Sequence, residues 1–149
     1  MQVVAFTLCK HRAAFRVEKV REVIRCASVA AVFRSPPFLQ GLLHVRGDAV
    51  PVLDLGILLG MGECTADGSY VVVVESGVLV VGFLAEGPVD ICDAGESTSH
   101  VPAGERGRAM DAVESVLLMD AAPVLLLDAD KVLALPDVRR LRQQRSDVP

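Results

Sequence analysis

Apolar residues occur in short blocks, mostly Val, Leu and Ala, separated by glycine, proline or charged positions. Blocks of this length that are rich in β-branched residues are typical of strands. The pattern predicts these strands: 2–8, 13–17, 41–45, 49–53, 70–75, 78–84, 115–119 and 124–127. The central blocks are apolar on both faces, and such strands need cover on both faces. Two stacked β layers, or two small barrels that share a seam, would provide that cover.

The segment 38–55 has the most distinctive pattern in the chain. Two apolar strands meet at a bend marked by Arg46-Gly47. The returning strand ends at Asp54, which is placed to cap a short helix over 54–60 that glycine ends. A hairpin with one charged residue at its tip and no catalytic residues beside it indicates a surface that binds partner proteins.

Other segments have simpler patterns. Residues 17–24 mix apolar and charged positions and fit either a bent strand or a short helix. Residues 93–112 are rich in Gly, Ser, Asp and Glu and predict a long loop. A helix is predicted over 128–135, ended by Pro136. The arginine-rich segment 136–149 is predicted to be a basic tail that frays.

The chain contains an internal repeat. Residues 43–55 align with 117–129, and both copies read strand, aspartate, short helix. A fainter repeat aligns 14–23 with 82–91. About five short strands barely bury their apolar faces alone, whereas two interlocked copies form one continuous core. We therefore predict a single domain over 1–135 made of two interlocked subdomains; chance alignment of Val- and Leu-rich strands is the alternative.

Composition restricts both fold and partners. The 149 residues fit one domain, and their 52% apolar content and mean hydropathy of +0.44 exclude disorder for most of the length. Only 4% are aromatic, so Val, Leu and Ala must fill the core, which favours an all-β fold with short helices. The net charge of −4 argues against nucleic acid, because phosphate binding needs clustered positive charge. Basic residues concentrate in 10–25 and acidic ones in 86–130, which suits either partner steering or solvated loops.

The cysteine pattern bears on metal binding and on the compartment. The four cysteines lack the close pairs of a zinc site, so no metal is expected. They are typical of buried small apolar residues in a reducing compartment. No secretion signal is recognisable, and no apolar run reaches the ~18 residues that cross a bilayer. We expect a cytoplasmic protein without membrane insertion.

No catalytic constellation is found in the sequence. His11, His44 and His100 lie far apart and lack a metal-binding spacing. The glycine-rich segment 95–104 lacks the Lys-Ser/Thr pair of a phosphate-binding loop, and no serine or cysteine occupies a nucleophile motif. His44 is expected to be structural or to lie at a partner surface. We therefore predict no catalytic residue and no cofactor.

Three residues are candidates for binding a partner. Val20 and Glu22 are either an ordinary buried valine and a solvated glutamate, or they lie at the rim of a groove between the two halves. In that groove the valine accepts another protein's helix and the carboxylate fixes its register. Arg46 is the stronger candidate, because a guanidinium offers a rigid fork of donors to carbonyls and carboxylates of a partner.

Several motifs, taken in order, resemble the CheW family, the coupling proteins of bacterial chemotaxis arrays. The motifs are Pro37-Phe38-Leu39-Gln40-Gly41-Leu42, His44-Val45-Arg46-Gly47 and Val50-Pro51-Val52-Leu53-Asp54-Leu55. Segments 17–24 and 81–83 add supporting matches. The resemblance extends over 2–135, and the order and spacing of the motifs make it specific.

The resemblance implies two interwound five-stranded SH3-like β-barrels. It also implies a non-enzymatic adaptor that couples the cytoplasmic tips of methyl-accepting chemoreceptors to the regulatory domain of the histidine kinase CheA. The receptor's helical hairpin would lie in the seam between the barrels. Val20, Glu22 and Arg46 match receptor-side positions, and Gly47 shapes the hairpin tip. A looser expectation places the kinase contact around 71–74.

The sequence departs from the family pattern in three places. His44 replaces the usual asparagine, Ala85-Glu86 replaces a valine–aspartate pair, and 120–123 lacks the expected glycines. These changes indicate a divergent member and leave open whether its partners are the standard set.

The extent of the match favours a stand-alone adaptor at membrane-associated receptor arrays, and association with other copies stays open. The alternative is a small-molecule-binding or enzymatic β-barrel domain. That alternative requires convergent polar groups in a closed pocket.

Overall fold

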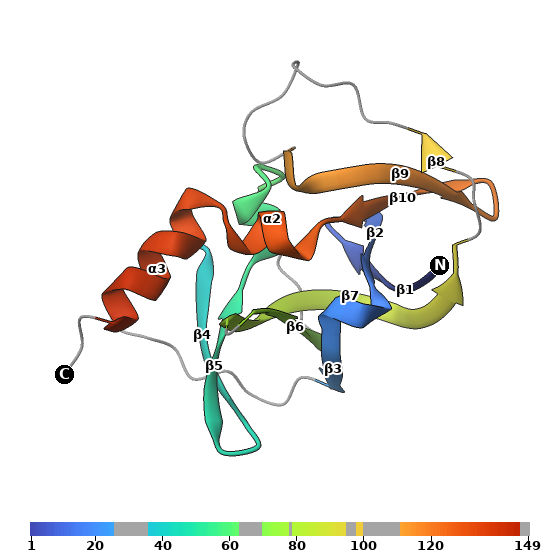
Figure 1. Ribbon diagram of the computed structural model, residues 1–149. Coiled ribbons are helices and arrows are strands. Elements are labelled where there is room, and N and C mark those ends of the chain that lie inside the picture. Colours follow the sequence, from blue (N-terminus) through green and yellow to red (C-terminus); the bar gives the residue numbers. More distant parts are fainter. Residues whose placement is uncertain (26–35, 63–69, 78, 95–97, 100–110, 147–149) are drawn as a thin grey trace.

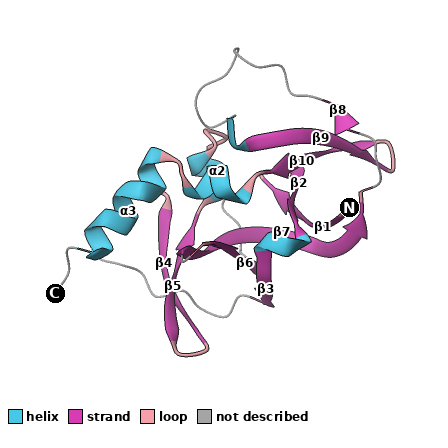
Figure 2. Cartoon of the chain, in the orientation of Figure 1, coloured by secondary structure: helices cyan, strands magenta, loops and turns pink. Residues whose placement is uncertain are grey.

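The computed structural model describes residues 1–25, 36–62, 70–77, 79–94, 98–99 and 111–146 (Figure 1). Strands dominate, and the helices are short apart from the last (Figure 2). The elements are β1 (Gln2–Leu8), β2 (His11–Arg16), the 3-10 helix η1 (Val17–Lys19), β3 (Val20–Arg25), β4 (Leu39–Val45), β5 (Asp48–Leu53), α1 (Leu55–Leu58), β6 (Tyr70–Ser76), β7 (Leu79–Asp93), β8 (Thr98–Ser99), β9 (Val113–Met119), β10 (Ala122–Leu127), α2 (Ala129–Leu133) and α3 (Pro136–Ser146).

Strand β7 joins the two halves of the molecule. Its first part pairs with β6 and, in parallel, with β5, whereas its last part pairs with β1. The first barrel therefore contains β3, β6, β7, β5 and β4, and the second contains β7, β1, β2, β10 and β9, with β8 beside β9. The predicted all-β class with short helices and two SH3-like barrels is confirmed. The sequence pattern predicted that this strand ends at residue 84, because the segment that follows is not a continuous apolar run; in the structure the strand continues to Asp93.

The first internal repeat is present in the structure. In each half a hairpin, β4–β5 or β9–β10, leads through an aspartate into a short helix. The backbone N–H of Asp54 donates to the carbonyl of Phe38 at 2.7 Å, and that of Asp128 donates to the carbonyl of Ala112 at 2.8 Å. The two halves thus have equivalent backbone hydrogen bonds as well as similar sequences.

The fainter repeat is also present, in the parallel strand pairs. Val52 of β5 lies opposite Gly82 of β7, and Leu126 of β10 lies opposite Ala14 of β2. These are positions that the two repeats align. Each half therefore closes on an equivalent parallel pair, which chance alignment would not produce.

One large apolar cluster extends across both halves. Phe15 of β2 stacks on Phe6 of β1, with ring centroids 5.8 Å apart, and on Phe83 of β7, at 5.6 Å. All three rings are fully buried. Burial of aromatic rings contributes strongly to core stability, so this cluster fixes how the halves pack.

Two sequence expectations are changed by the structure. Residues 17–24 form both of the alternatives, η1 followed by β3. The segment predicted to be a frayed tail instead forms α3, which Pro136 begins. Proline is favoured in the first turn of a helix, and Val138 and Leu141 bury an apolar side against the core. Among the described helices, none has the length and apolar character needed to cross a bilayer.

The prediction of buried cysteines is wrong where the structure describes them. Cys9 lies in the β1–β2 turn with φ of 49°, is partly exposed and is disulfide-bonded. Cys92 of β7 is a partly exposed free thiol. Partial burial, and then the charge of Asp90, raise the pKa of this thiol. Cys26 and Cys64 lie outside the described residues.

Candidate partner-binding surface

The tip of the β4–β5 hairpin is a two-residue turn. Arg46 and Gly47 have φ of 50° and 88°, and the last strand pair before them is Val45 with Asp48. Positive φ at both central residues matches the twist of the strands, as in type I′ turns. An arginine in this conformation costs about 1–2 kcal/mol relative to its ordinary backbone regions. The turn therefore holds an arginine where glycine or asparagine is easier to accommodate.

The base of this hairpin is firmly anchored. Val50, Val52 and Leu53 are buried in the barrel. Asp54, also buried, accepts a hydrogen bond at Oδ1 from the backbone N–H of Ile57 at 3.1 Å and so caps α1. The predicted cap is confirmed. The tip thus projects from a rigid support.

Strand β3 lies beside β6 and carries the other two candidates. Partly buried and exposed residues alternate along it, with Val20 and Glu22 among the partly buried ones. A bulge between these two residues shifts the register against β6. Bulges redirect side chains locally and increase strand twist. Val20 packs at the border of the large apolar cluster, so it is neither fully buried nor free of the core.

The structure brings Glu22 and Arg46 together. Arg46 Nε lies 3.2 Å from Glu22 Oε2, while the arginine side chain is 78% exposed and the glutamate 24% exposed. Ion pairs this exposed contribute about 0–1 kcal/mol to stability. The pair therefore does little to hold the fold together. It orients the guanidinium beside β3.

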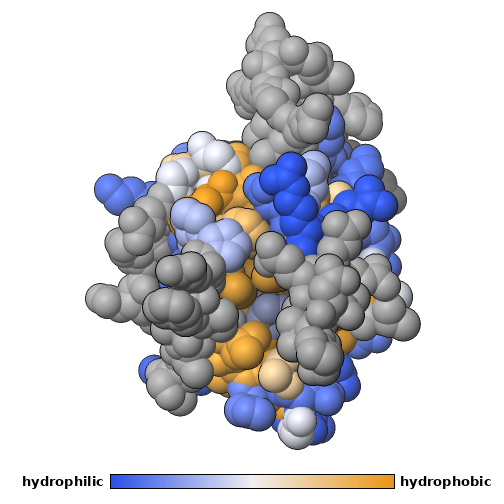
Figure 3. All heavy atoms as spheres, turned by 90° about the vertical axis from the view of Figure 1, so that its left-hand side faces the viewer, coloured by the Kyte–Doolittle hydropathy of each residue, from blue (hydrophilic) through white to orange (hydrophobic). Residues whose placement is uncertain are grey.

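Two further exposed residues lie on these strands. His44 of β4 is exposed near the tip, whereas Val23 of β3, which is 37% exposed, directly follows Glu22 and so points to the other face of the strand. Figure 3 views the molecule from the side of α3 and the β4–β5 hairpin and shows apolar surface bordered by polar surface. Val23 is not among the candidates that the sequence offers, because the residues of β3 (Val-Arg-Glu-Val-Ile-Arg) do not alternate between charged and apolar; only their burial does. The approach of Glu22 to Arg46 has no local signal, because the two residues lie on separate strands.

All four valines of 71–74 in β6 are fully buried, so these side chains themselves offer no surface to a partner. The expectation of a kinase contact on the barrel surface around them stays a prediction.

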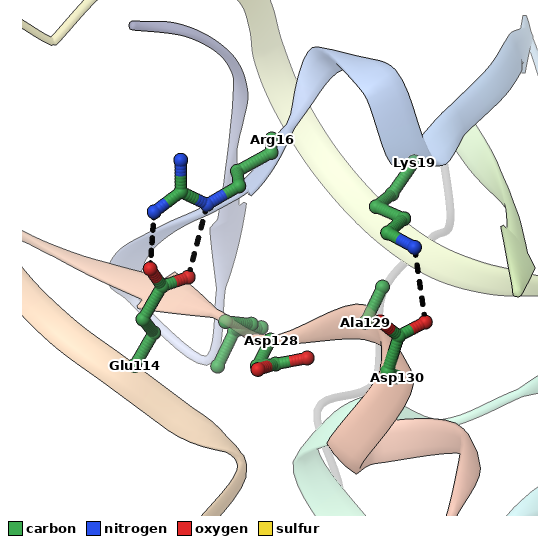
Figure 4. A pocket seen from close by; sticks show the side chains of 7 residues that line it. Arg16, Lys19, Glu114, Asp128, Ala129 and Asp130 are labelled. Atoms are coloured by element: carbon green, nitrogen blue, oxygen red, sulfur yellow. Dashed lines mark hydrogen bonds and ion pairs between the residues drawn. The ribbon is translucent and has the colours of Figure 1, made fainter.

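A second group of charged residues lies where the halves meet (Figure 4). Arg16 Nε donates to Glu114 Oε2 at 3.1 Å, and the guanidinium makes a second bond to the other carboxylate oxygen. Lys19 Nζ lies 3.1 Å from Asp130 Oδ1, which also accepts a hydrogen bond from the Ser76 hydroxyl. We call Lys19, Asp130 and Ser76 the η1–α2 junction.

These pairs account for the charges of a small pocket apart from that of Asp128, whose carboxylate caps α2. The pocket encloses about 170 Å³ and is lined by Arg16, Lys19, Leu127, Ala129, Asp130, Glu114 and Asp128. The hydrogen bond that Arg16 donates to Glu114 raises the pKa of Arg16, and those donated by Ser76 and then Lys19 lower the pKa of Asp130. The polar groups converge on one another, which leaves a ligand little to bind. Among the described residues there is also no group of three His, Cys, Asp or Glu side chains that would hold a metal.

The fold and this surface define a class of all-β domains in which two SH3-like barrels share a strand and present a charged hairpin tip. The chain belongs to the CheW-like domain family, whose model matches residues 2–137.

Relatives and a solved structure agree with this assignment. The chain is 24% identical over 131 residues to chemotaxis protein CheW of Klebsiella aerogenes, an alignment that covers 87% of this chain and 79% of the relative. It is 27% identical over 85 residues to chemotaxis protein CheW of Thermotoga maritima, covering 57% and 56% of the two chains. The crystal structure of scaffolding protein TtCheW from Thermoanaerobacter tengcongensis superposes with a TM-score of 0.70 at 22% identity, over 85% of this chain and 82% of that one. The last similarity supports the fold.

Proposed function

We propose that this protein is a non-enzymatic chemotaxis adaptor that couples chemoreceptor cytoplasmic tips to the histidine kinase CheA. The family assignment and the relatives' description as chemotaxis and scaffolding proteins support this proposal. The observation that carries it is the exposed Arg46, aimed by Glu22 from a rigid hairpin. The adaptor would work in the cytoplasm at receptor arrays and use no cofactor.

On this proposal Arg46 and Glu22 act together on the receptor side. Glu22 engages Nε of Arg46, and no other ion pair of this guanidinium occurs within the described part of the chain. The terminal nitrogens are then available to carbonyls or carboxylates of a receptor helix. Gly47 supplies the positive φ that shapes the tip, and Val20, at the start of the strand that carries Glu22, adds apolar contact.

The adaptor would regulate the kinase by fixing its position relative to the receptor. The regulatory domain of CheA would bind elsewhere on the barrels, and other copies of the chain are further candidate partners. Coupling between two such sites typically amounts to about 1–3 kcal/mol, which changes an affinity by roughly 5–150-fold. An adaptor of this kind needs only differential binding and no chemistry of its own.

The test is a charge reversal at the hairpin tip. Arg46→Glu places two carboxylates side by side and should abolish co-sedimentation with receptor cytoplasmic fragments and kinase, with little change in unfolding free energy. Arg139→Glu, at an exposed arginine of α3, is the matched control. Undiminished co-sedimentation of Arg46→Glu would remove the assigned role.

A further inference from the structure

The 3-10 helix η1 is the crossing between the two barrels near the N-terminus. It follows β2 of the second barrel and leads directly into β3 of the first. Its two flanks are held by different partners. Arg16 is bound to Glu114 within the second barrel, whereas Lys19 is bound to Asp130 of α2.

Asp130 ties together the ends of two neighbouring strands. Val20, the first residue of β3, lies opposite Val74 of β6. Lys19 precedes Val20, and Ser76 ends β6, so both donors to Asp130 come from the same end of this strand pair. These two hydrogen bonds, from Ser76 and then Lys19, lower the pKa of Asp130, which means that they favour its charged form.

The barrel fold does not require this junction. The internal repeat aligns Asp130 of α2 with Gly56 of α1, which has no side chain to place there. Helix α1 is nevertheless capped and buried in the same manner as α2. The junction is therefore an addition to one half, at the entrance to the strand that carries Glu22.

We propose that Asp130 is a positioning residue for the Glu22–Arg46 surface. By holding Lys19 and Ser76, it fixes the start of β3 ahead of the bulge, and so fixes where Glu22 meets Arg46. Partner affinity then depends on a side chain that does not touch the partner. This inference rests on the proposed function for its binding readout, but its structural claim is measurable without a partner.

The experiment compares three variants of the full chain with the wild type. Asp130→Ala removes the junction, the double variant Lys19→Asp/Asp130→Lys restores an ion pair with reversed charges, and Glu114→Ala removes the neighbouring pair inside the second barrel. Amide hydrogen exchange of β3 measures how firmly the strand is held. Affinity for a receptor cytoplasmic-tip fragment measures the consequence, at a temperature where circular dichroism shows every variant folded.

We expect Asp130→Ala to raise exchange in β3 and to weaken affinity by about two- to fivefold, because the side chains of the Lys19–Asp130 pair are 38% and 56% exposed. The reversed pair should recover most of both effects, and Glu114→Ala should lower stability without changing either. Unchanged β3 exchange in Asp130→Ala would overturn the proposal. Weakened affinity that the reversed pair fails to recover would also overturn it, because it would indicate direct contact with the partner. If the wild type binds no receptor fragment, the proposed function fails while the exchange measurement still decides the positioning claim.

Discussion

The two hairpins β4–β5 and β9–β10 have the same backbone and opposite chemistry. Both turn through two residues of positive φ, Arg46-Gly47 in one and Asp120-Ala121 in the other. In the first half the arginine meets Glu22; the residue that the repeat aligns with Glu22 is Asp90, again a carboxylate. The second half thus has two acidic residues at the positions of the Arg46–Glu22 pair, and Asp90 pairs instead with Arg12, at 3.7 Å. The fold requires the repeated hairpin, aspartate and short helix. It does not require the charges at the hairpin tip and at the position of Glu22.

The largest expected effect tests whether the two halves contribute equally to the shared core. Phe15 and Phe83 are aligned by the repeat, but Phe15 stacks on two rings and Phe83 on one. Phe15→Ala should lower the free energy of unfolding by about 3–5 kcal/mol and by more than Phe83→Ala. Urea denaturation measures both values. Leucine at the same positions keeps the core filled if an alanine variant fails to fold, and an equal or larger loss at Phe83 would contradict the asymmetry.

A smaller effect is expected at Gly82 and Ala14, the aligned residues of the two parallel strand pairs, which differ by one methyl group. A Cβ added at Gly82 would lie 2.5 Å from Cγ1 of Val71, a buried and stiff side chain, whereas the aligned residue of the second half is Ala14. Gly82→Ala should cost about 1–3 kcal/mol through overpacking. Ala14→Gly should cost about 0.5–1 kcal/mol through chain entropy. Thermal unfolding of both variants checks that Gly82→Ala costs more stability than Ala14→Gly. Stabilisation by Gly82→Ala would contradict overpacking at this strand pair.

The smallest effect concerns the turns themselves. Ala121 has φ of 62°, a conformation that glycine adopts without strain. Ala121→Gly should stabilise the protein by about 0.5–1 kcal/mol, and Gly47→Ala should destabilise it by a similar amount. A Cβ at Gly47 would meet no atom within 4 Å, so backbone strain is the dominant contribution. Chemical denaturation should give changes of opposite sign, and changes of the same sign would mean that the turns are not equivalent.

The sequence predicted the repeated frame because that frame is local. Strand patterns, the Arg46-Gly47 bend and the Asp54 cap depend on neighbours a few residues apart, and each is found in place. The full length of β7 was missed, because its second part pairs with β1, far away in the sequence. Helix α3 was missed because two buried residues, Val138 and Leu141, stabilise an otherwise charged segment.

The candidate site was also predicted only as far as local sequence allows. Arg46 and Gly47 were selected from a local turn, and Val20 and Glu22 from a resemblance. Their meeting depends on how β3 and the hairpin pack, and nothing near Glu22 in the sequence specifies it. The η1–α2 junction was not expected either, since Lys19 and Asp130 lie at opposite ends of the chain.

The shared strand β7 has a consequence for how this protein is made and degraded. Each barrel completes its sheet with part of one continuous segment, Leu79–Asp93, so both barrels depend on the same strand. On a ribosome, the first barrel can close before β9 and β10 exist, but the second must wait for almost the whole chain. During degradation, a single proteolytic cut within β7 breaks a strand that both barrels need. The two barrels therefore complete their folding one after the other during synthesis, and both lose their structure when β7 is cut.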